Sequence, residues 1–282
     1  MKEALYYEKK ENKKIRCVLC PKYCMISEGD TGICRVRKNI DGKLYALSYG
    51  KITGYHLDPI EKKPLYNYKK GSMIFSIGSY GCNLTCKFCQ NYEIAHGNPR
   101  TIDLTIDDII EKAKEDSRSI GIAYTYNEPL INYEFTLDCA KKAKEEGLDN
   151  ILVTNGYINE EPLKELLKYI DAINIDLKAF NNDFYKNICG GRVGEVKKSI
   201  ILAANETHVE ITCLVIDDLN SNKEEIKNMI DWIAAIDREI PLHLARYFPR
   251  YKMKRPPTKL ETLNLLYREA KKSLKYVYLG NV

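Results

Sequence analysis

The sequence lacks the segments that direct proteins into or across membranes. Its first 16 residues, MKEALYYEKKENKKIR, are charged and have none of the apolar centre of a signal peptide. No run approaches the roughly 18 apolar residues that a spanning helix needs. There is also no RNA-binding signature, zinc-finger helix pattern, internal repeat or low-complexity tract, so nucleic acid is not favoured as a partner. We therefore expect a cytoplasmic protein with no membrane partner.

Charge imbalance is small. The 282 residues carry a net charge of +5, are 44% apolar and 29% charged, and are enough for a sizeable core. Lysines cluster in the runs EKKENKK, KKAKEE and MKRPPTK. Such runs are usually solvated faces, and only a weak preference for an acidic partner follows from them.

Cysteine is plentiful, with ten residues, seven of them in two clusters. In a reducing compartment clustered thiols indicate metal sites rather than disulfides. Cys139 lies in the apolar stripe of a predicted helix and Cys213 in a predicted strand, so both are expected to be inert core thiols. Cys189, which precedes two glycines in a loop, has no assigned role.

Strand and helix patterns alternate from residue 72 onward. Thr105 and Asp108 have the spacing of a capping box, and Gly147 is expected to end the next helix. The predicted strands are 72–78, 120–126, 149–155, 172–178, 208–216 and 241–247, with a short addition at 276–280. The predicted helices are 105–117, 132–147, 160–170, 194–205, 221–236 and 258–274.

This repeated βα order predicts an α/β fold with a parallel sheet, either closed as a barrel or open and doubly wound. In both cases the chemistry gathers at the carboxyl ends of the strands. The polar segments at those ends are the cysteine loop, TYNEP, TNGY, DLK and HLARYFPRY.

Residues 1–71 differ from the rest and predict a small cysteine-rich module plus a connector, with residues 72–282 forming the main domain. The module contains Cys17, Cys20, Cys24 and Cys34. Four clustered thiolates indicate a closed second metal site. Zinc would organise a short module, whereas an iron–sulfur cluster, which we slightly favour, would serve electron transfer or substrate binding.

The second cluster has three thiols, Cys82, Cys86 and Cys89, within eight residues. A [4Fe–4S] cluster normally takes four cysteines, so three would leave one iron open, as catalytic sites do. The alternative is a zinc ion closed by His96, although zinc ligands more often come as two close pairs.

The segment CNLTCKFC resembles the Cys-x3-Cys-x2-Cys motif of radical SAM enzymes. This resemblance implies a partial (β/α)6 barrel and a [4Fe–4S] cluster whose open iron is chelated by S-adenosyl-L-methionine. The segments CVLCPKYCMISEGDTGICRVR, DPIEKKPLYNY, TYNEP, VTNGY and HLARYFPRYKM narrow it to enzymes of the AmmeMemoRadiSam system, which are similar to pyruvate formate-lyase activating enzymes.

The resemblance implies roles near the cofactor, and each has a simpler alternative. Phe88 would face the adenine, or only pack. Asn127 and Glu128 stand where the family has Gly-Gly-Glu and would receive the methionine amino group; the two glycines are missing, and Glu128 could instead start a helix. Asn155 would bind the ribose or carboxylate, or serve as a turn residue.

Further along, Asp176 and Lys178 alternate on a strand and would lie near the methionine moiety, or form an internal salt bridge. Glu210 is polar in a strand that should be buried on both faces, so it is a candidate cofactor contact. His243 is expected near the cofactor, with a structural histidine as the alternative. Arg246 is expected to bind a carboxylate of the substrate.

The resemblance also implies a reaction and its partners. A 5′-deoxyadenosyl radical would take a hydrogen atom from a substrate such as a glycyl site on a partner protein, another protein or a small molecule. A low-potential donor of the flavodoxin or ferredoxin type would supply the electron, and the enzyme is expected to be a monomer. A non-catalytic iron–sulfur scaffold for electron transfer is the alternative.

Overall fold

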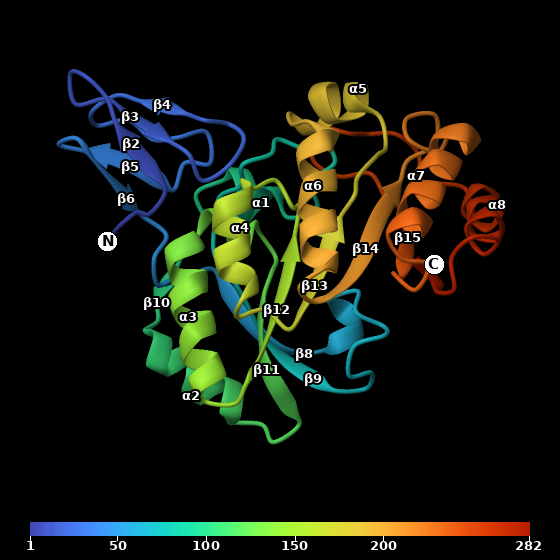
Figure 1. Ribbon diagram of the computed structural model, residues 1–282, viewed down its shortest axis with the longest axis horizontal. Helices are drawn as coiled ribbons and strands as arrows, with labels where there is room; N and C mark the ends of the chain where they lie inside the picture. Colours follow the sequence, from blue (N-terminus) through green and yellow to red (C-terminus); the bar gives the residue numbers. More distant parts are fainter.

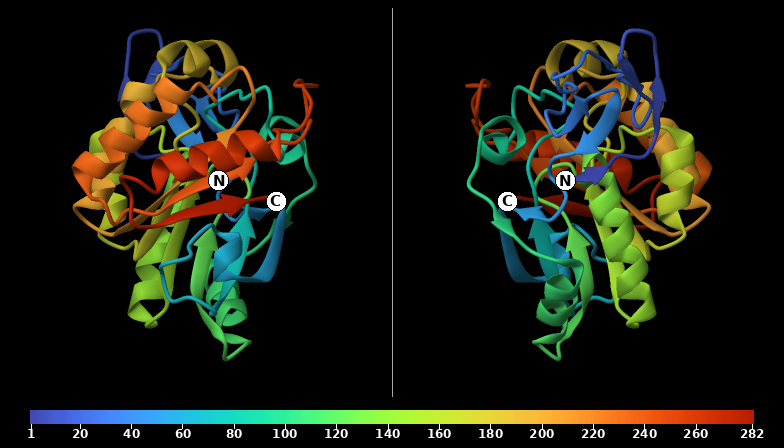
Figure 2. Two further views of the ribbon diagram at one scale, coloured as in Figure 1. Left: turned by 90° about the vertical axis from the view of Figure 1, so that its right-hand side faces the viewer. Right: turned by 90° about the vertical axis from the view of Figure 1, so that its left-hand side faces the viewer.

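The computed structural model describes residues 1–282 and contains one large curved sheet with helices along its outer side (Figures 1 and 2). The sheet has eight strands in the order β16-β15-β14-β13-β12-β11-β9-β8. All neighbouring pairs are parallel except β8 with β9. The predicted α/β architecture is therefore confirmed.

The strands of this sheet are β8 (Gly54–Pro59), β9 (Met73–Gly78), β11 (Ser119–Tyr124), β12 (Asp149–Thr154), β13 (Ala172–Asp176), β14 (His208–Val215), β15 (Leu242–Arg246) and β16 (Val277–Gly280). The main helices are α2 (Ile106–Lys114), α3 (Tyr133–Glu145), α4 (Glu160–Leu167), α6 (Val193–Ala204), α7 (Lys223–Ile236) and α8 (Leu260–Ala270). The shorter ones are α1 (Tyr92–His96), α5 (Asn182–Phe184) and the single turns η1 (Ile60–Lys62), η2 (Pro129–Ile131) and η3 (Tyr185–Cys189).

Every strand and helix that the alternation predicted is present, with ends shifted by a few residues. The capping box before α2 is confirmed: the Thr105 side chain accepts from the Asp108 amide, and the Asp108 carboxylate accepts from the Thr105 amide. The inward faces of the helices pack on the strands in a core of 60 buried residues, which includes Cys139 and Cys213 as expected.

Residues 1–46 form the cysteine-rich module, which consists of short antiparallel strands. Its pieces are β1 (Lys2–Glu3), β2 (Tyr7–Lys9), β3 (Ile15–Cys17), β4 (Met25–Ile26), β5 (Arg37–Ile40) and β6 (Lys43–Ala46). A separate pair joins β7 (Lys51–Ile52) to β10 (Ile102–Asp103). The module sits at the carboxyl ends of the parallel strands (Figure 1), where the Asn159 amide donates to the Leu19 carbonyl and Lys22 donates to the Gly190 carbonyl.

The connector enters the sheet region rather than merely joining two parts. It contributes β8, and the residues after η1 pass along the inner face of the sheet. There the Asn174 side chain donates to the Pro64 carbonyl at 2.8 Å, and the Glu210 carboxylate accepts from the Asn67 amide at 2.7 Å. Because β8 and β16 each have only one neighbour, the barrel is partial. The Tyr278 hydroxyl on β16 donates to the Asn67 side chain of the connector.

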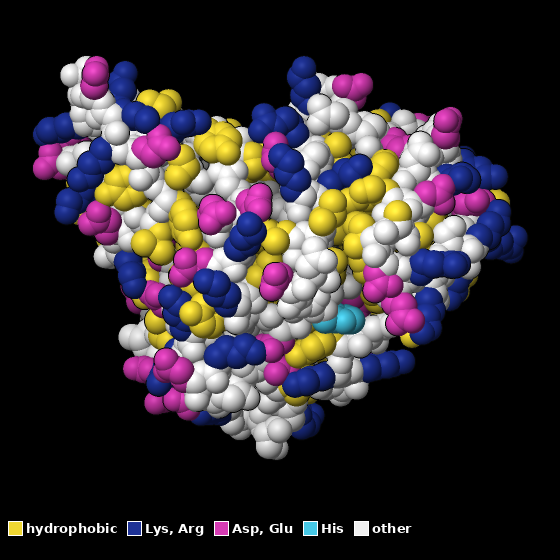
Figure 3. Space-filling view, in the orientation of Figure 1, with side chains coloured by type: hydrophobic (Ala, Val, Ile, Leu, Met, Phe, Trp, Pro, Cys, Tyr) yellow, Lys and Arg dark blue, Asp and Glu magenta, His cyan; other side chains and the backbone are white.

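The charged side chains cover the surface as a mixture. Figure 3 shows Lys and Arg interspersed with Asp and Glu over the visible face, in agreement with solvated lysine runs. No helix in the structure combines the length and the apolar character that crossing a membrane requires.

We expect Asn174→Ala to destabilise the barrel because Asn174 is buried and bonds two groups. Its removal leaves the Pro64 carbonyl without a donor and the Thr212 hydroxyl without an acceptor. The free energy of unfolding, measured by urea denaturation, should fall by about 1–3 kcal/mol. The exposed Asn205→Ala is the control, with an expected change below about 0.5 kcal/mol; equal effects would contradict a buried role for Asn174.

Candidate active site

A cavity of ≈590 Å³ lies at the carboxyl ends of the parallel strands. Ten of the predicted site residues line it: Cys82, Cys86, Phe88, Cys89, Asn127, Glu128, Asn155, Asp176, Lys178 and His243. Two predicted contacts, Glu210 and Arg246, do not. The residues come from the cysteine loop, from the ends of β11, β12 and β13, and from within β15, so the sheet brings together groups that are up to 161 positions apart, from Cys82 to His243.

The cysteine loop follows β9 and is held by hydrogen bonds on both sides. The Thr85 amide donates to the Cys189 carbonyl at 2.8 Å, and the Lys87 amide donates to the Ile188 carbonyl at 3.0 Å. On the other side the Lys252 amide donates to the Lys87 carbonyl at 3.0 Å. These bonds place all three thiols on the wall of one cavity.

The donor set fits an iron–sulfur cluster, because three soft thiols face one cavity. Cys82 accepts from the Leu84 amide at 3.4 Å and from the Asn155 side chain at 3.6 Å. Burial raises the pKa of Cys82 and raises that of Cys89 to about 11, so metal binding would release protons here. No group of three His, Cys, Asp or Glu side chains in the structure is already arranged to hold an ion.

Cys189, which had no predicted role, lies beside the cysteine loop. It ends η3 and is fully buried, and its thiol beside Cys86 lowers the pKa of Cys86. The spacing of the three-cysteine motif contains no sign of this residue, because Cys189 lies 100 positions beyond Cys89. Its position depends on the loop after β13 folding back onto residues 84–88.

Glu128 is buried in the cavity wall and is bonded by three donors. One carboxylate oxygen accepts from the Thr154 hydroxyl at 2.5 Å and the Leu130 amide at 3.0 Å, and the other accepts from the Asn155 amide at 2.8 Å. Burial raises its pKa to about 7. The side chain of Glu128 also caps η2, so the helix-start alternative is observed, and the same carboxylate lines the cavity.

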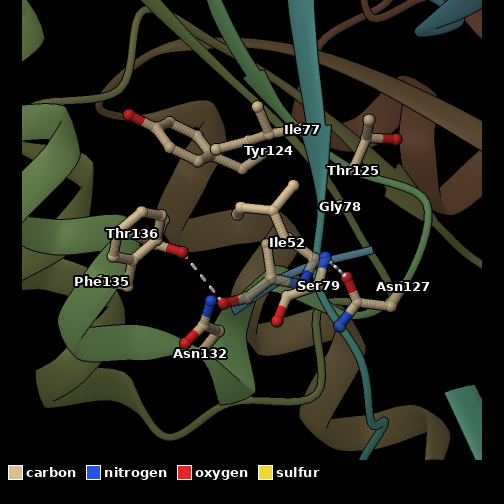
Figure 4. Close-up of a pocket in the computed structure, with 11 residues that line it drawn as sticks. Ile52, Ile77, Gly78, Ser79, Tyr124, Thr125, Asn127, Asn132, Phe135 and Thr136 are labelled. Carbon is tan, nitrogen blue, oxygen red and sulfur yellow. Dashed lines mark hydrogen bonds between the residues drawn. The ribbon is translucent and has the colours of Figure 1, made fainter. Parts of the chain in front are cut away.

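Asn127 lines the cavity, but its amide is used by the protein. Its oxygen accepts from the Ser79 amide at 2.9 Å and its nitrogen donates to the Gly81 carbonyl at 3.2 Å, which ties the chain after β11 to the chain after β9. Figure 4 shows Asn127 turned toward Ser79 at the edge of a much smaller cavity of ≈10 Å³. The contacts observed for Asn127 therefore position the start of the cysteine loop.

Asn155, Asp176 and Lys178 surround the same space. The Asn155 side chain donates to Asn83 at 3.0 Å while its oxygen accepts from the Tyr157 amide, as a turn residue would. The Lys178 ammonium forms the expected ion pair with Asp176 at 2.8 Å. Asn155 is therefore the turn residue, and Asp176 with Lys178 the salt bridge, that the simpler alternatives predicted. All three side chains also line the cavity.

Phe88 is 5% exposed and contributes an apolar surface to the cavity. Its ring packs near Phe184, with centroids 6.0 Å apart, and the Lys178 ammonium lies 5.9 Å from its centre. His96, the alternative zinc ligand, also lines the cavity and stacks on Tyr251. It does not belong to any group of three side chains that could hold a metal ion.

Glu210 lies behind His243 rather than on the cavity surface. The carboxylate is fully buried and is 2.6 Å from His243 Nε2 and 3.1 Å from His208 Nε2. Burial alone would raise its pKa, but hydrogen bonds from the two histidines and the Asn67 amide lower it to about 2. An ionised carboxylate only accepts, so Nε2 of His243 carries hydrogen and Nδ1 is the ring nitrogen able to accept.

Arg246 is turned away from the cavity at the end of β15. Its Nε donates to the Thr258 carbonyl at 2.8 Å, and its guanidinium lies 5.0 Å from the centre of the Phe248 ring. The structure therefore does not bring Arg246 together with the other predicted residues.

The connector supplies cavity residues that the sequence analysis missed. Lys63 is buried, lines the cavity and pairs with Asp58 at 2.8 Å, and the Tyr126 hydroxyl donates to the same carboxylate oxygen at 2.8 Å. Tyr66 packs edge-on against His243 with ring centroids 4.9 Å apart. Asp58, Lys63 and Tyr66 lie in the segment DPIEKKPLYNY. Because this segment contains several charged residues, the sequence did not predict that they would be buried.

Known proteins resemble this chain in sequence and in fold. The model of the radical SAM superfamily matches residues 76–233. An uncharacterised protein of Methanocaldococcus jannaschii, MJ0808, is 42% identical over all of this chain and 86% of its own, and a pyruvate formate-lyase-activating enzyme of Clostridium pasteurianum is 27% identical over 69% and 85%. The structure of Streptococcus suis SuiB bound to S-adenosylmethionine superposes with a TM-score of 0.56 at 18% identity, over 71% of this chain and 48% of that one, which shows a shared fold.

We expect Glu210→Gln to change how stability depends on pH. The folded pKa is about 2 and an unfolded glutamate titrates near 4.3, so the unfolded state binds more protons between these values. The stabilisation from the ionised carboxylate is complete above about pH 5 and is lost as the pH falls toward 2.

Urea unfolding of the metal-free chain at several pH values would measure this effect. The difference in unfolding free energy between wild type and Glu210→Gln should shrink by about 3 kcal/mol from pH 6 to pH 2. The exposed Glu224→Gln is the control and should follow the wild-type slope. A constant difference between wild type and Glu210→Gln would contradict the low pKa.

Proposed function

Because the chain belongs to the radical SAM superfamily, we propose that Cys82, Cys86 and Cys89 hold a [4Fe–4S] cluster and that S-adenosyl-L-methionine occupies the same cavity. The chain is a radical SAM enzyme. In such enzymes the reduced cluster supplies the electron that cleaves S-adenosyl-L-methionine to a 5′-deoxyadenosyl radical, which takes a hydrogen atom from the substrate. The observation that carries this proposal is the convergence of three thiols and several polar strand ends on one cavity.

The chain's own residues would bind and orient the cofactors. Asn155 donates to the Cys82 sulfur, which favours the thiolate that a metal needs. Glu128 is a buried carboxylate that accepts from the Asn155 amide, and the Asn155 side chain in turn contacts Cys82. In its ionised form Glu128 would accept from an ammonium group. Phe88 provides an apolar wall that keeps water from the reacting atoms.

The substrate proposal is a glycyl site on a partner protein. A relative that is 27% identical over most of its length is a pyruvate formate-lyase-activating enzyme. An open hollow of ≈590 Å³ shares Gln90, Asn91 and Asn281 with the cavity and extends past Phe248 and Arg250. A loop of a partner could approach the cavity along this hollow, whereas another protein or a small molecule is the alternative substrate.

Two further components complete the proposal. A low-potential flavodoxin or ferredoxin would reduce the cluster, and the enzyme would act as a monomer. Cys17, Cys20, Cys24 and Cys34 would hold a second metal centre, either iron–sulfur or zinc.

We expect the reconstituted chain to produce 5′-deoxyadenosine when it is incubated anaerobically with dithionite and S-adenosyl-L-methionine. Cys86→Ala should lower the yield to background because a cluster ligand is lost. Cys139→Ala is the matched control, since this thiol belongs to α3, is buried in the core and does not line the cavity, and should keep most of the yield. No product from a protein loaded with iron, or an unchanged yield with Cys86→Ala, would refute the proposal.

We expect a partner protein captured anaerobically to gain a glycyl radical, visible by electron paramagnetic resonance, when the chain, reductant and S-adenosyl-L-methionine are added. The Cys86→Ala variant should give no such signal. Product formation without a radical on any captured protein would favour the small-molecule alternative. A cluster spectrum that does not change on addition of S-adenosyl-L-methionine would favour the non-catalytic scaffold.

A further inference from the structure

The end of β15 and the loop that follows it carry charge of one sign only. Residues 246–259, RYFPRYKMKRPPTK, contain six lysines and arginines and no aspartate or glutamate. They include the run MKRPPTK, which the sequence alone indicates to be a solvated face. Because the loop follows the carboxyl end of a parallel strand, it lies on the side of the sheet where the cavity opens.

The other two lysine runs contain their own counter-charges. In EKKENKK, the Lys10 ammonium pairs with Glu8 at 2.7 Å. In KKAKEE, the Lys142 ammonium pairs with Glu146 at 3.1 Å. Charges that are matched within a few residues have little left to offer a partner, so these two runs are the solvated faces that their sequences indicate.

The loop 246–259 has almost no counter-charge. Arg255 is the only one of its six cations that pairs with a carboxylate, that of Asp218 at 3.6 Å. Arg250, Lys252 and Lys254 are exposed and form no ion pair. Their positive charges are therefore unmatched by the chain itself, unlike those of the other lysine runs.

The loop is anchored to the cysteine loop and to α1. The Lys252 amide donates to the Lys87 carbonyl at 3.0 Å, and the Tyr251 ring stacks on Tyr92 with centroids 4.8 Å apart, so the loop lies beside α1 (Figure 2). Lys87 is itself exposed and unpaired. We call the basic rim the four residues Lys87, Arg250, Lys252 and Lys254. These contacts fix the rim relative to the cavity.

The basic rim borders the open hollow that leads into the cavity. Arg250 lines this hollow together with Phe248, whose ring is 43% exposed. Arginine and aromatic side chains are the types that most often anchor protein interfaces. Unmatched cations beside an exposed ring therefore favour a polypeptide that carries acidic residues, because opposite charges attract and orient the two partners.

We propose that the basic rim docks the protein substrate through acidic residues that flank its reacting glycine, and that Phe248 packs on the same segment. This inference rests on the proposed function, since it describes how the partner's loop reaches the cavity. An electron donor is the competing occupant of a basic surface. The substrate is favoured because the hollow beside Arg250 continues into the cavity, whereas a donor passes on an electron without entering it.

Peptide binding tests the charge preference. The probe is a fluorescein-labelled peptide with one glycine flanked by glutamates, and the comparison peptide has lysines in their place. Fluorescence anisotropy with the reconstituted chain should show the acidic peptide binding at least about tenfold more tightly. Raising the salt from about 50 to about 300 mM should reduce this preference, because exposed charges are screened. Equal binding of the two peptides, or no binding of the acidic one, would overturn the proposal.

Charge reversal locates the binding surface. Combining Arg250→Glu, Lys252→Glu and Lys254→Glu should weaken binding of the acidic peptide by on the order of tenfold or more. The control reverses three exposed lysines that form no ion pair and changes the net charge equally: Lys9, Lys14 and Lys168. Circular dichroism verifies that both variants are folded. Equal weakening in both would show attraction by net charge alone and would overturn the proposal.

Deuterium transfer separates substrate docking from donor docking. The acidic peptide carries α-deuterated glycine, and dithionite is the reductant. One C–D bond of the glycine breaks, the deuterium atom bonds to C5′ of the 5′-deoxyadenosyl radical, and a glycyl radical remains. Mass spectrometry should find deuterated 5′-deoxyadenosine with the wild type and several-fold less with the rim variant.

Equal deuterium transfer by the wild type and the rim variant would overturn the proposal. A loss that appears only when flavodoxin replaces dithionite would assign the rim to the electron donor and would also overturn it. Failure of the wild type to form any 5′-deoxyadenosine would instead refute the proposed function. The peptide-binding measurements would still decide whether the rim recognises acidic residues.

Discussion

The buried carboxylate of Glu210 holds together three parts of the molecule. It accepts from the Asn67 amide of the connector and is paired with His208 and with His243, so one charge links the connector, β14 and the cavity wall. A buried carboxylate is stable only when such donors satisfy it. The position of His243, and the packing of Tyr66 against it, therefore depend on the connector being in place inside the barrel.

The repeating part of the fold was predictable because its signals are local. Alternating apolar patterns, the capping box at Thr105 and the stop at Gly147 all act within a few residues, and the corresponding strands and helices are present. The path of the connector was not predictable. Segment 55–71 is rich in lysine and tyrosine, and β8 and the inner-face contacts of Pro64 and Asn67 depend on partners more than 100 positions away.

The candidate site was likewise predictable in one part and not in another. Spacing identified Cys82, Cys86 and Cys89. The polar strand ends marked the segments, and the resemblance to radical SAM enzymes singled out Glu128, Asn155 and the other predicted residues that line the cavity. Alternation along a strand tells which side of the sheet a residue faces but not how far along the barrel it lies, so Glu210 was expected at the surface of the cavity and is found behind His243. Cys189 and Lys63 were missed because their positions are set by tertiary folding.

The contact between Tyr278 and Asn67 has a consequence for how the protein is made. It spans 211 positions, close to the length of the main domain, and it joins the last strand to the connector. Contacts of such long range form late, because much chain entropy must be lost before they can be made. On the ribosome, His243 would lack its stacking partner Tyr278 until the final strand had emerged. The cavity wall at His243 would thus be among the last features to form, after the cysteines of both clusters had already been exposed to the metals of the surroundings.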